Sequence, residues 1–260
     1  MRKILVVFWE YTRQSIKIST QQQVGAVFFI FGKLLRFGMF ALFVYYLLSQ
    51  TKLLAGYTMN QTLIFFLTFH IIDGLAQMLF RQVYRFRPLI LSGDLDLVLV
   101  KPVHPFVRIL VGGVDILDVI PLIVYTGILF WILPLTSGIT VVSMVLYGVL
   151  ILNALVIATA FHIFVLCLGI LSTEVDHTIM IYRDITKMGS FPVDIYAQPI
   201  RWIITFIIPI GIMITFPVQA LFGILSGQLL LISIIFSIVF LGLALISWRY
   251  AITRYQSASS

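Results

Sequence analysis

The sequence predicts an all-α membrane protein with six transmembrane helices and both termini in the cytosol. Of its 260 residues, 61% are hydrophobic and only 10% are charged, whereas soluble domains are about 45–50% apolar and about 25% charged. Several apolar runs reach the roughly 20 residues that cross about 30 Å of hydrocarbon. Lys and Arg gather in alternate connecting segments, which is typical of a chain that crosses a bilayer repeatedly.

The first 22 residues predict a helix that lies in the membrane interface. Leu5, Phe8, Trp9 and Ile16 fall near one face at helical spacing, while the charged residues fall elsewhere. A partly disordered tail is the alternative. The expected division is an interfacial amphipathic helix over 1–22, a single transmembrane domain over 23–250 and a short cytosolic tail over 251–260.

Five of the six crossings follow from the apolar runs. They lie at about 27–49 and 61–80, within 106–135, within 139–171, and at about 229–248. The other crossing is ambiguous, because Pro209 and Pro217 interrupt the apolar run 202–223. That run can instead enter and leave by the same face as a re-entrant element. Residues 173–190 would then cross the membrane with their charges turned toward a partner or a cavity.

Basic residues set the orientation. Residues 1–22 and 81–105 carry four Lys or Arg each, residues 172–201 carry three, and the C-terminal end carries two, Arg249 and Arg254. The opposite connections carry only Lys52. Because Lys and Arg concentrate in cytosolic segments, both termini are predicted to be cytosolic. The net charge of +7 then reflects basic residues beside lipid headgroups, and we expect no nucleic-acid partner.

The sequence carries no signature of an enzyme. Gly32-Lys33 lacks the Ser or Thr that follows the Lys of a phosphate-binding loop, and the chain has no Gly-x-Ser-x-Gly elbow. Its four histidines are scattered, and no Cys/His group has zinc spacing. We therefore expect a non-catalytic chain with no metal or cofactor of its own.

Ionisable residues inside the apolar runs are the first functional candidates. Asp73 lies in the second run, and Asp115 and Asp118 lie three residues apart in the third. Lys33 and Arg36 lie in the first run at comparable depth. These acids would form a proton or substrate relay in a stand-alone, ion-coupled secondary transporter. Ion pairs between neighbouring helices are the alternative, which the nearby bases favour.

Two neutral polar residues lie in the fourth run. His162 and Asn153 are expected to make interhelical hydrogen bonds, which contribute about 0.6 to 2 kcal/mol each in membranes.

The connection between the second and third spans is unusually apolar for a cytosolic loop. Its central residues are Arg87, Leu89, Ile90, Leu91, Gly93, Asp94 and Leu95. Pro88, Gly93 and Pro102 divide the loop into short pieces. Leu and Val in such a loop must be buried against the protein itself, the membrane surface or another subunit.

At this loop the chain resembles the permease subunits of type-two ABC exporters, closest to the bacterial permeases of about this length that work with a separate ATPase. The residues that carry the resemblance, in order, are Ser92-Gly93-Asp94-Leu95-Asp96, Leu99-Val100-Lys101-Pro102, Phe191-Pro192-Val193-Asp194-Ile195-Tyr196, Arg201, Thr205-Phe206-Ile207-Ile208-Pro209, Phe216-Pro217 and Leu221-Phe222-Gly223. The likeness covers most of the chain, and its combined order is more specific than any single motif.

The resemblance implies a division of labour between subunits. ATP and Mg²⁺ would be bound by a partner ATPase, and two permease subunits, identical or homologous, would form the pathway in the bacterial plasma membrane. The loop 85–101 would couple to the ATPase. Its apolar contacts would be Leu89, Ile90, Leu91 and Leu95, with Arg87 and Asp94 as the polar rim.

The resemblance also implies a re-entrant or gate region and a direction of transport. The gate region would include Phe191, Pro192, Pro209 and Pro217. Transport would be export. The 22 Phe residues suit an amphiphilic, drug-like or lipid-like cargo, and a hydrophobic or cationic molecule is expected.

Overall fold

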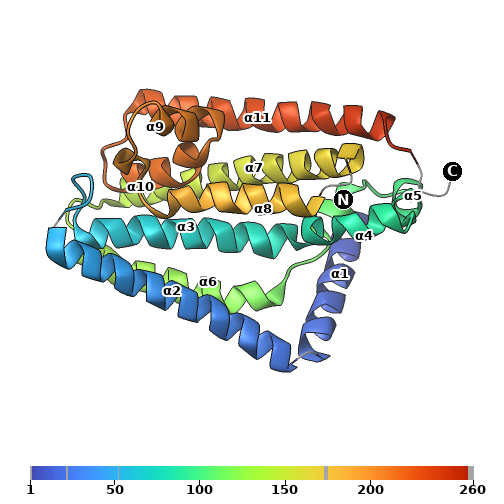
Figure 1. Ribbon diagram of the computed structural model, residues 1–260, viewed down its shortest axis with the longest axis horizontal. Coiled ribbons are helices and arrows are strands. Elements are labelled where there is room, and N and C mark those ends of the chain that lie inside the picture. The colour runs from blue at the N-terminus through green and yellow to red at the C-terminus, as the bar shows by residue number, and fades with distance from the viewer. Residues whose placement is uncertain (1, 22, 52, 173–174, 257–260) are drawn as a thin grey trace.

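The computed structural model describes residues 2–21, 23–51, 53–172 and 175–256, and within these ranges the chain forms helices and no strand. Five helical stretches in this part of the chain are long and apolar enough to span a membrane. They are Gln23–Thr51 (α2), Met59–Leu91 (which begins with α3, Met59–Phe80), Ile116–Leu135 (which includes α6, Val119–Ile132), Val141–Ser172 (α7) and Gly227–Thr253 (α11). They run lengthwise through one elongated bundle (Figure 1). All five directly predicted spans are confirmed, and the protein is an all-α membrane protein.

Helix α1 (Arg2–Gln21) lies across the bundle rather than along it (Figure 1). It is held by Thr12, whose buried side-chain oxygen accepts a hydrogen bond from the Val114 backbone at 3.2 Å. Gly113 has φ +104°, and a Cβ there would lie 2.6 Å from the Tyr11 backbone, so this contact requires glycine. Leu5 and Trp9 remain exposed on α1. A helix transverse to the spans, with an exposed apolar face, has the geometry of an interfacial helix.

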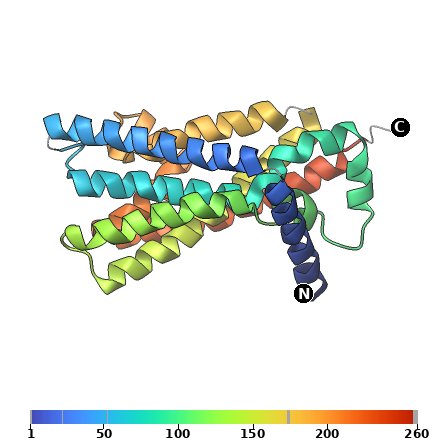
Figure 2. The same ribbon diagram turned by 90° about the horizontal axis from the view of Figure 1, so that it is seen from below.

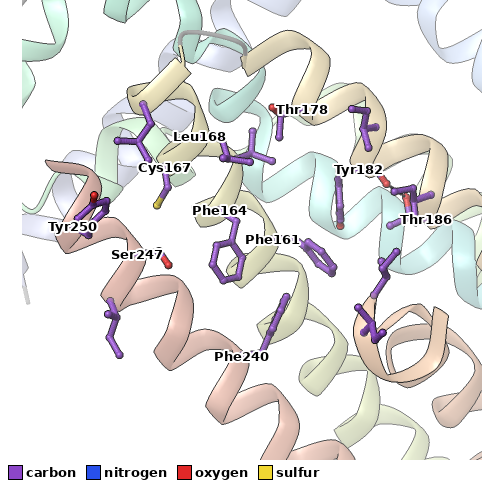
Figure 3. A pocket seen from close by; sticks show the side chains of 17 residues that line it. Phe161, Phe164, Cys167, Leu168, Thr178, Tyr182, Thr186, Phe240, Ser247 and Tyr250 are labelled. Atoms are coloured by element: carbon purple, nitrogen blue, oxygen red, sulfur yellow. Dashed lines mark hydrogen bonds between the residues drawn. The ribbon is translucent and has the colours of Figure 1, made fainter. Parts of the chain in front are cut away.

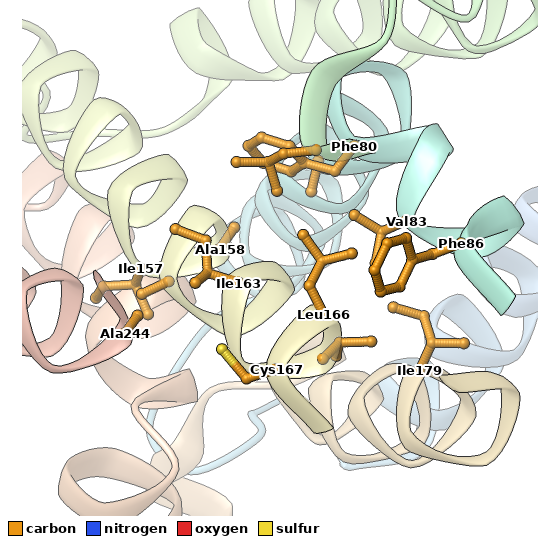
Figure 4. Packing of buried hydrophobic residues seen from close by; sticks show 14 of the residues in the cluster. Phe80, Val83, Phe86, Ile157, Ala158, Ile163, Leu166, Cys167, Ile179 and Ala244 are labelled. Atoms are coloured by element: carbon orange, nitrogen blue, oxygen red, sulfur yellow. The ribbon is translucent and has the colours of Figure 1, made fainter. Parts of the chain in front are cut away.

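The main core joins α3, α7 and α11 to the segments that follow α3 and α7. Figure 4 shows Phe86 and Val83 packed against Leu166 of α7. On the other side of α7, Ile157 lies beside Ala244 of α11, a small residue that lets the two helices approach closely (Figure 4). Asn153 of α7 donates to the Ser233 carbonyl of α11 at 3.3 Å. The predicted interhelical hydrogen bond of Asn153 is therefore confirmed.

Helix α8 (Val175–Thr186) and the 3₁₀ turn Lys187–Ser190 run along the bundle beside α7 and α3 (Figure 1). Their combined length is roughly 25 Å, somewhat less than the hydrocarbon thickness of about 30 Å. The apolar run after them is bent by 76° between Ile200–Ile207 and Gly211–Leu221. Its first part includes α9 (Ile200–Trp202) and its second ends with α10 (Phe216–Leu221). Both labelled helices lie at the end of the bundle where α11 begins (Figure 1). This arrangement favours the re-entrant alternative.

The two prolines of this run have different roles. Pro209 lies in the break between the bent halves, where a proline removes a backbone donor. Pro217 lies in the first turn of α10, which tolerates proline, and the helix continues through it. The bend also needs Gly211, because a Cβ there would lie 2.7 Å from the Thr205 hydroxyl oxygen. Only Pro209 therefore interrupts the helix as predicted.

Candidate functional site

Two six-residue helices project from one end of the bundle, the end that also carries α1 and the last turn of α11 (Figures 1 and 2). They are α4 (Phe86–Leu91) and α5 (Asp94–Leu99). Gly93 joins them with φ +75°, a left-handed conformation that favours glycine. The Ser92 hydroxyl donates to the Asp94 carboxylate at 2.8 Å, which fixes the turn. Its Lys and Arg content predicts that this is the cytosolic end.

The inner face of this helix pair is buried in the chain's own core. Phe86 and Leu95 are fully buried, and Ile90 nearly so. Leu89 is half-buried against the same core. Ile90 and Leu95 therefore cannot offer an exposed contact, which corrects the surface role expected for them. They hold the helix pair against the bundle.

The outer face of the helix pair is apolar and exposed. Leu91 is 60% exposed, Leu97 59% and Val100 80%, while Arg87 and Asp94 lie beside them on the surface. The sequence analysis missed Leu97 and Val100. Helical spacing through 94–99 carried the signal, since Leu95 and Val98 share one face and leave Leu97 on another.

Helix α4 is tied to the start of α8. The Arg87 guanidinium pairs with the Asp176 carboxylate at 2.9 Å, and both side chains are about half exposed. Beneath this pair, Val175 and Phe86 pack over Gly169 of α7, where a Cβ would lie 2.5 Å from the Val175 methyl group. Helices α4 and α8 are therefore in direct contact.

A cavity of about 460 Å³ lies between α2, α3 and α8. Its charged lining comprises Arg36, Asp73, Arg183, Asp184 and Lys187. Arg183 and Asp184 of α8 thus line a cavity, as the re-entrant alternative required of its charges, whereas Asp176 pairs with Arg87. Other lining residues are aromatic: Phe40 of α2, Phe66 and Phe69 of α3, and Phe191 after the 3₁₀ turn.

Nearer the cytosolic end, the intramembrane acids are paired with bases. Lys33 of α2 pairs with Asp118, whose side chain is fully buried. The Arg81 side chain pairs with Asp115 at 3.1 Å. The predicted ion pairing is confirmed for both acids. Arg36 makes no ion pair within the described part of the chain.

Asp73 and Lys33 are linked through a glutamine. The Gln77 amide donates to the Asp73 carboxylate at 2.6 Å. The Lys33 ammonium donates to the Gln77 carbonyl oxygen at 3.1 Å. Lys33, Gln77 and Asp73 thus form a hydrogen-bonded chain between α2 and α3, and Asp73 lies at the end of this chain that lines the cavity.

His162 is buried in α7 and bonds within its own helix. Its Nδ1 donates to the Ala158 carbonyl at 2.7 Å, and its ring contacts Phe80 and Tyr182 at centroid distances of 4.8 and 5.1 Å. The expected interhelical hydrogen bond is wrong, because Nδ1 bonds to its own helix and the buried Nε2 has no hydrogen-bond partner among the described residues.

The opposite end of the bundle holds a hydrogen-bonded cluster around Asp194. Its carboxylate accepts from the Tyr57 hydroxyl at 2.8 Å and from the Gln219 amide at 3.1 Å, and it pairs with Arg201. Burial raises the pKa of Tyr57 to about 12, so its hydroxyl keeps the donated proton at neutral pH. The cluster fastens the α2–α3 connection to the re-entrant segment.

The predicted gate residues are divided between this end and the cavity. Phe191 lines the cavity, and its ring centroid lies 5.5 Å from that of Phe40. Pro192 follows it directly, and Val193 donates its backbone N–H to the Thr215 hydroxyl at 3.2 Å. Pro209 and Pro217 lie in the bent pair and not in the cavity lining.

A second cavity, of about 750 Å³, lies on the other face of α8, against α7 and α11. Figure 3 shows Phe161, Phe164 and Phe240 turned toward one another in it. Its lining is almost entirely apolar, with Tyr182 and Thr186 of α8 among the few polar side chains. Helix α8 therefore separates an apolar cavity from a charged one.

Sequence comparison places this architecture in a family. No curated protein matches the chain. The family model described as ABC-2 family transporter protein matches residues 34–259, which is most of the chain and includes the α4–α5 pair, the charged cavity and the re-entrant segment. The chain therefore belongs to the ABC-2 family of transporter proteins.

Proposed function

We propose that the chain is the membrane-spanning permease subunit of an ATP-driven exporter in the bacterial plasma membrane. ATP and Mg²⁺ are bound by a separate ATPase subunit, and this chain supplies half of the pathway. Membership of the ABC-2 family supports a transport role. The observation that carries the proposal is the exposed apolar face of α4 and α5, formed by Leu91, Leu97 and Val100.

Such a face suits a groove on a motor subunit. Its apolar residues are rimmed by Arg87 and Asp94, which orient the contact. Its inner side is fixed to the bundle by Phe86 and Leu95. Closure of an ATPase dimer would therefore move the helix pair as a rigid body.

The movement reaches the charged cavity through α8. The Arg87–Asp176 pair and the Phe86–Val175 contact join α4 to the first turn of α8. The last turns of α8 carry Arg183 and Asp184 into the cavity lining. One short helix thus links the proposed motor contact to the proposed pathway.

A second permease subunit, identical or homologous, completes the pathway. Arg36, Asp184 and Lys187 are exposed at the cavity mouth. A charged side chain facing lipid at this depth costs about 2.5–3.5 kcal/mol or more. A facing subunit encloses these groups in a shared polar space.

The motor contact is tested by Leu91→Asp, with Leu53→Asp as the matched control. Both leucines are exposed, but Leu53 lies in the connection at the opposite end. We expect Leu91→Asp to insert normally, lose the copurifying ATPase and lose ATP-dependent export, because a carboxylate would be placed in an apolar contact. Leu53→Asp should retain both. Undiminished ATPase binding and export in Leu91→Asp would contradict the proposal, as would ion-driven flux in liposomes that contain this chain alone.

A further inference from the structure

Two cations face the charged cavity without a carboxylate partner among the residues that the structure describes. Arg36 makes no ion pair in the ranges that the structure describes, and it lies roughly 20 Å along α2 from the start of that helix. The Arg183 guanidinium lies over the Tyr84 ring, 5.9 Å from its centroid, and has no carboxylate within ion-pair distance among the described side chains. Unpaired ionisable groups at membrane depth mark substrate or ion pathways.

The acids of the same cavity are already engaged. Asp73 accepts a hydrogen bond from Gln77 at 2.6 Å, and Asp184 pairs with Lys187 at 2.6 Å. The lining holds three cations and two carboxylates, so positive charge is in excess. A cationic ligand would face this excess, whereas an anion would neutralise it.

Most of the remaining lining is aromatic. Phe40 and Phe66 stack at a centroid distance of 4.7 Å, and Phe191 lies 5.5 Å from Phe40. The volume of about 460 Å³ falls within the 300–1,000 Å³ of ligand pockets. The cavity therefore combines an apolar wall with guanidinium groups, whose planar donors match carboxylate and phosphate oxygens.

We propose that this cavity binds an amphiphilic organic anion. The acidic head, a carboxylate, sulfonate or phosphate, is held by Arg36 and Arg183, and the apolar body packs against Phe40, Phe66 and Phe191. The inference rests on the proposed function, because it names the substrate class of the same pathway. It replaces the hydrophobic or cationic cargo expected from the Phe content.

The test compares two fluorescent probes with the same apolar body and opposite charge. The full chain is placed in nanodiscs of zwitterionic lipid and titrated with dansylglycine, an anion, or dansylcadaverine, a cation, and the signal of empty discs is subtracted. We expect dansylglycine to bind the wild type at least tenfold more tightly. Equal affinities, or tighter binding of the cation, would overturn the proposal. The comparison uses only the wild-type protein, so it does not depend on the folding of a variant.

Variants locate the site. Arg36→Gln and Arg183→Gln should each weaken dansylglycine binding at least tenfold, while Arg36→Lys retains most of it. Arg13→Gln is the control, since Arg13 lies exposed on α1 away from the cavity. Unchanged dansylglycine binding in both Gln variants would overturn the assignment. The assignment would also be overturned if the Gln variants bound both probes equally weakly and a dimer dissociated. The arginines would then stabilise the contact between subunits.

A lipid headgroup is the other source of the same chemistry. In discs that contain phosphatidylglycerol, a diffusible cargo should still bind with little loss of affinity. Abolished dansylglycine binding would mean that a resident anionic lipid fills the site, and the cargo assignment would fall.

Failure of the inference is separable from failure of the proposed function. Probe binding is measured without an ATPase, whereas the proposed function is tested by ATPase copurification and the Leu91→Asp variant. A chain that retains its ATPase but does not prefer the anion loses only the inference. A chain that binds the anion without any ATPase contact loses only the exporter assignment.

Discussion

Charged residues within the membrane-spanning region fall into two sets with different surroundings. Lys33 with Asp118, and Arg81 with Asp115, neutralise one another between neighbouring segments. Arg36 and Arg183 instead face a cavity. The first set satisfies charges that the bilayer would otherwise penalise, and the second set carries the proposed anion site.

The Lys33–Asp118 pair can be tested by removing one partner or both. Lys33→Met leaves a buried carboxylate without its cation and should destabilise the protein by about 3–5 kcal/mol. Lys33→Met combined with Asp118→Leu should recover most of this loss, because no charge remains buried. Thermal unfolding in detergent, followed by size exclusion, measures both. Equal instability of the single and double variants would show that packing, not charge pairing, is responsible.

The bend of the re-entrant segment depends on one glycine. Gly211→Ala places a Cβ 2.7 Å from the Thr205 hydroxyl oxygen and should destabilise the protein by about 1–3 kcal/mol. Gly127→Ala is the control, because nothing lies within 4 Å of the added carbon. The same thermal assay compares them. A Gly211→Ala variant as stable as the control would contradict the close approach described for the bend.

At the scale of the residue, the sequence could predict which acids need partners but not every partner. The apolar setting of Asp115 and Asp118 favoured ion pairing, because an unpaired charge there is costly. Arg81 was assigned only to the cytosolic connection, yet it pairs with Asp115. The residues are 34 positions apart in the chain, and no local periodicity joins them. The prediction for His162 failed for a similar reason, because packing decides whether its ring bonds to its own helix or to a neighbouring one.

Among the structural elements, α8 is the one that lies between the two cavities. Arg183, Asp184 and Lys187 turn toward the charged cavity, whereas Tyr182 and Ile185 turn toward the apolar one. Two faces of one helix thus meet two different environments. Arg183 is thus turned into a cavity within the bundle, whereas Asp184 and Lys187 remain exposed at the cavity mouth.

The link between α4 and α8 is tested by exchanging its charges. Arg87→Asp should change stability by less than about 1 kcal/mol, since half-exposed ion pairs contribute little. It should nevertheless reduce substrate-stimulated ATP hydrolysis by the partner, because the contact between α4 and α8 is loosened. The exchange Arg87→Asp with Asp176→Arg should restore stimulation. If the single variant couples normally, or the exchange restores nothing, the pair does not transmit motion.

The sequence predicted only in part which residues of α4 and α5 are buried and which are exposed. An apolar cytosolic loop predicted burial against some surface, and the structure provides two surfaces at once. Ile90 and Leu95 meet the chain's own core, and Leu91 and Leu97 face outward. Two helices of six residues are too short for a clear period, so the choice of face depends on how the pair docks.

For the molecule as a whole, the exposed charges at the cavity mouth predict a subunit interface. Lys187→Cys in a Cys167→Ala background should be cross-linked to a second subunit by a short bis-maleimide in membranes. Ile235→Cys is the control, because Ile235 is exposed on α11, away from the charged cavity. Gel mobility reports the product. Cross-linking of Ile235→Cys but not of Lys187→Cys would place the interface on the other side of the bundle.

The sequence by itself determined that this protein lies in a lipid bilayer. It also determined the positions of five membrane spans and the end of the bundle that carries most of the basic residues. These follow from composition, run length and charge distribution, which are local or summed properties of the chain. Only the tertiary structure decided that the proline-containing run bends and that α8 lies between two cavities. It also decided which apolar residues of α4 and α5 stay exposed. Each of these depends on contacts between residues far apart in the chain, and the free energy of such contacts leaves no periodic trace in the sequence.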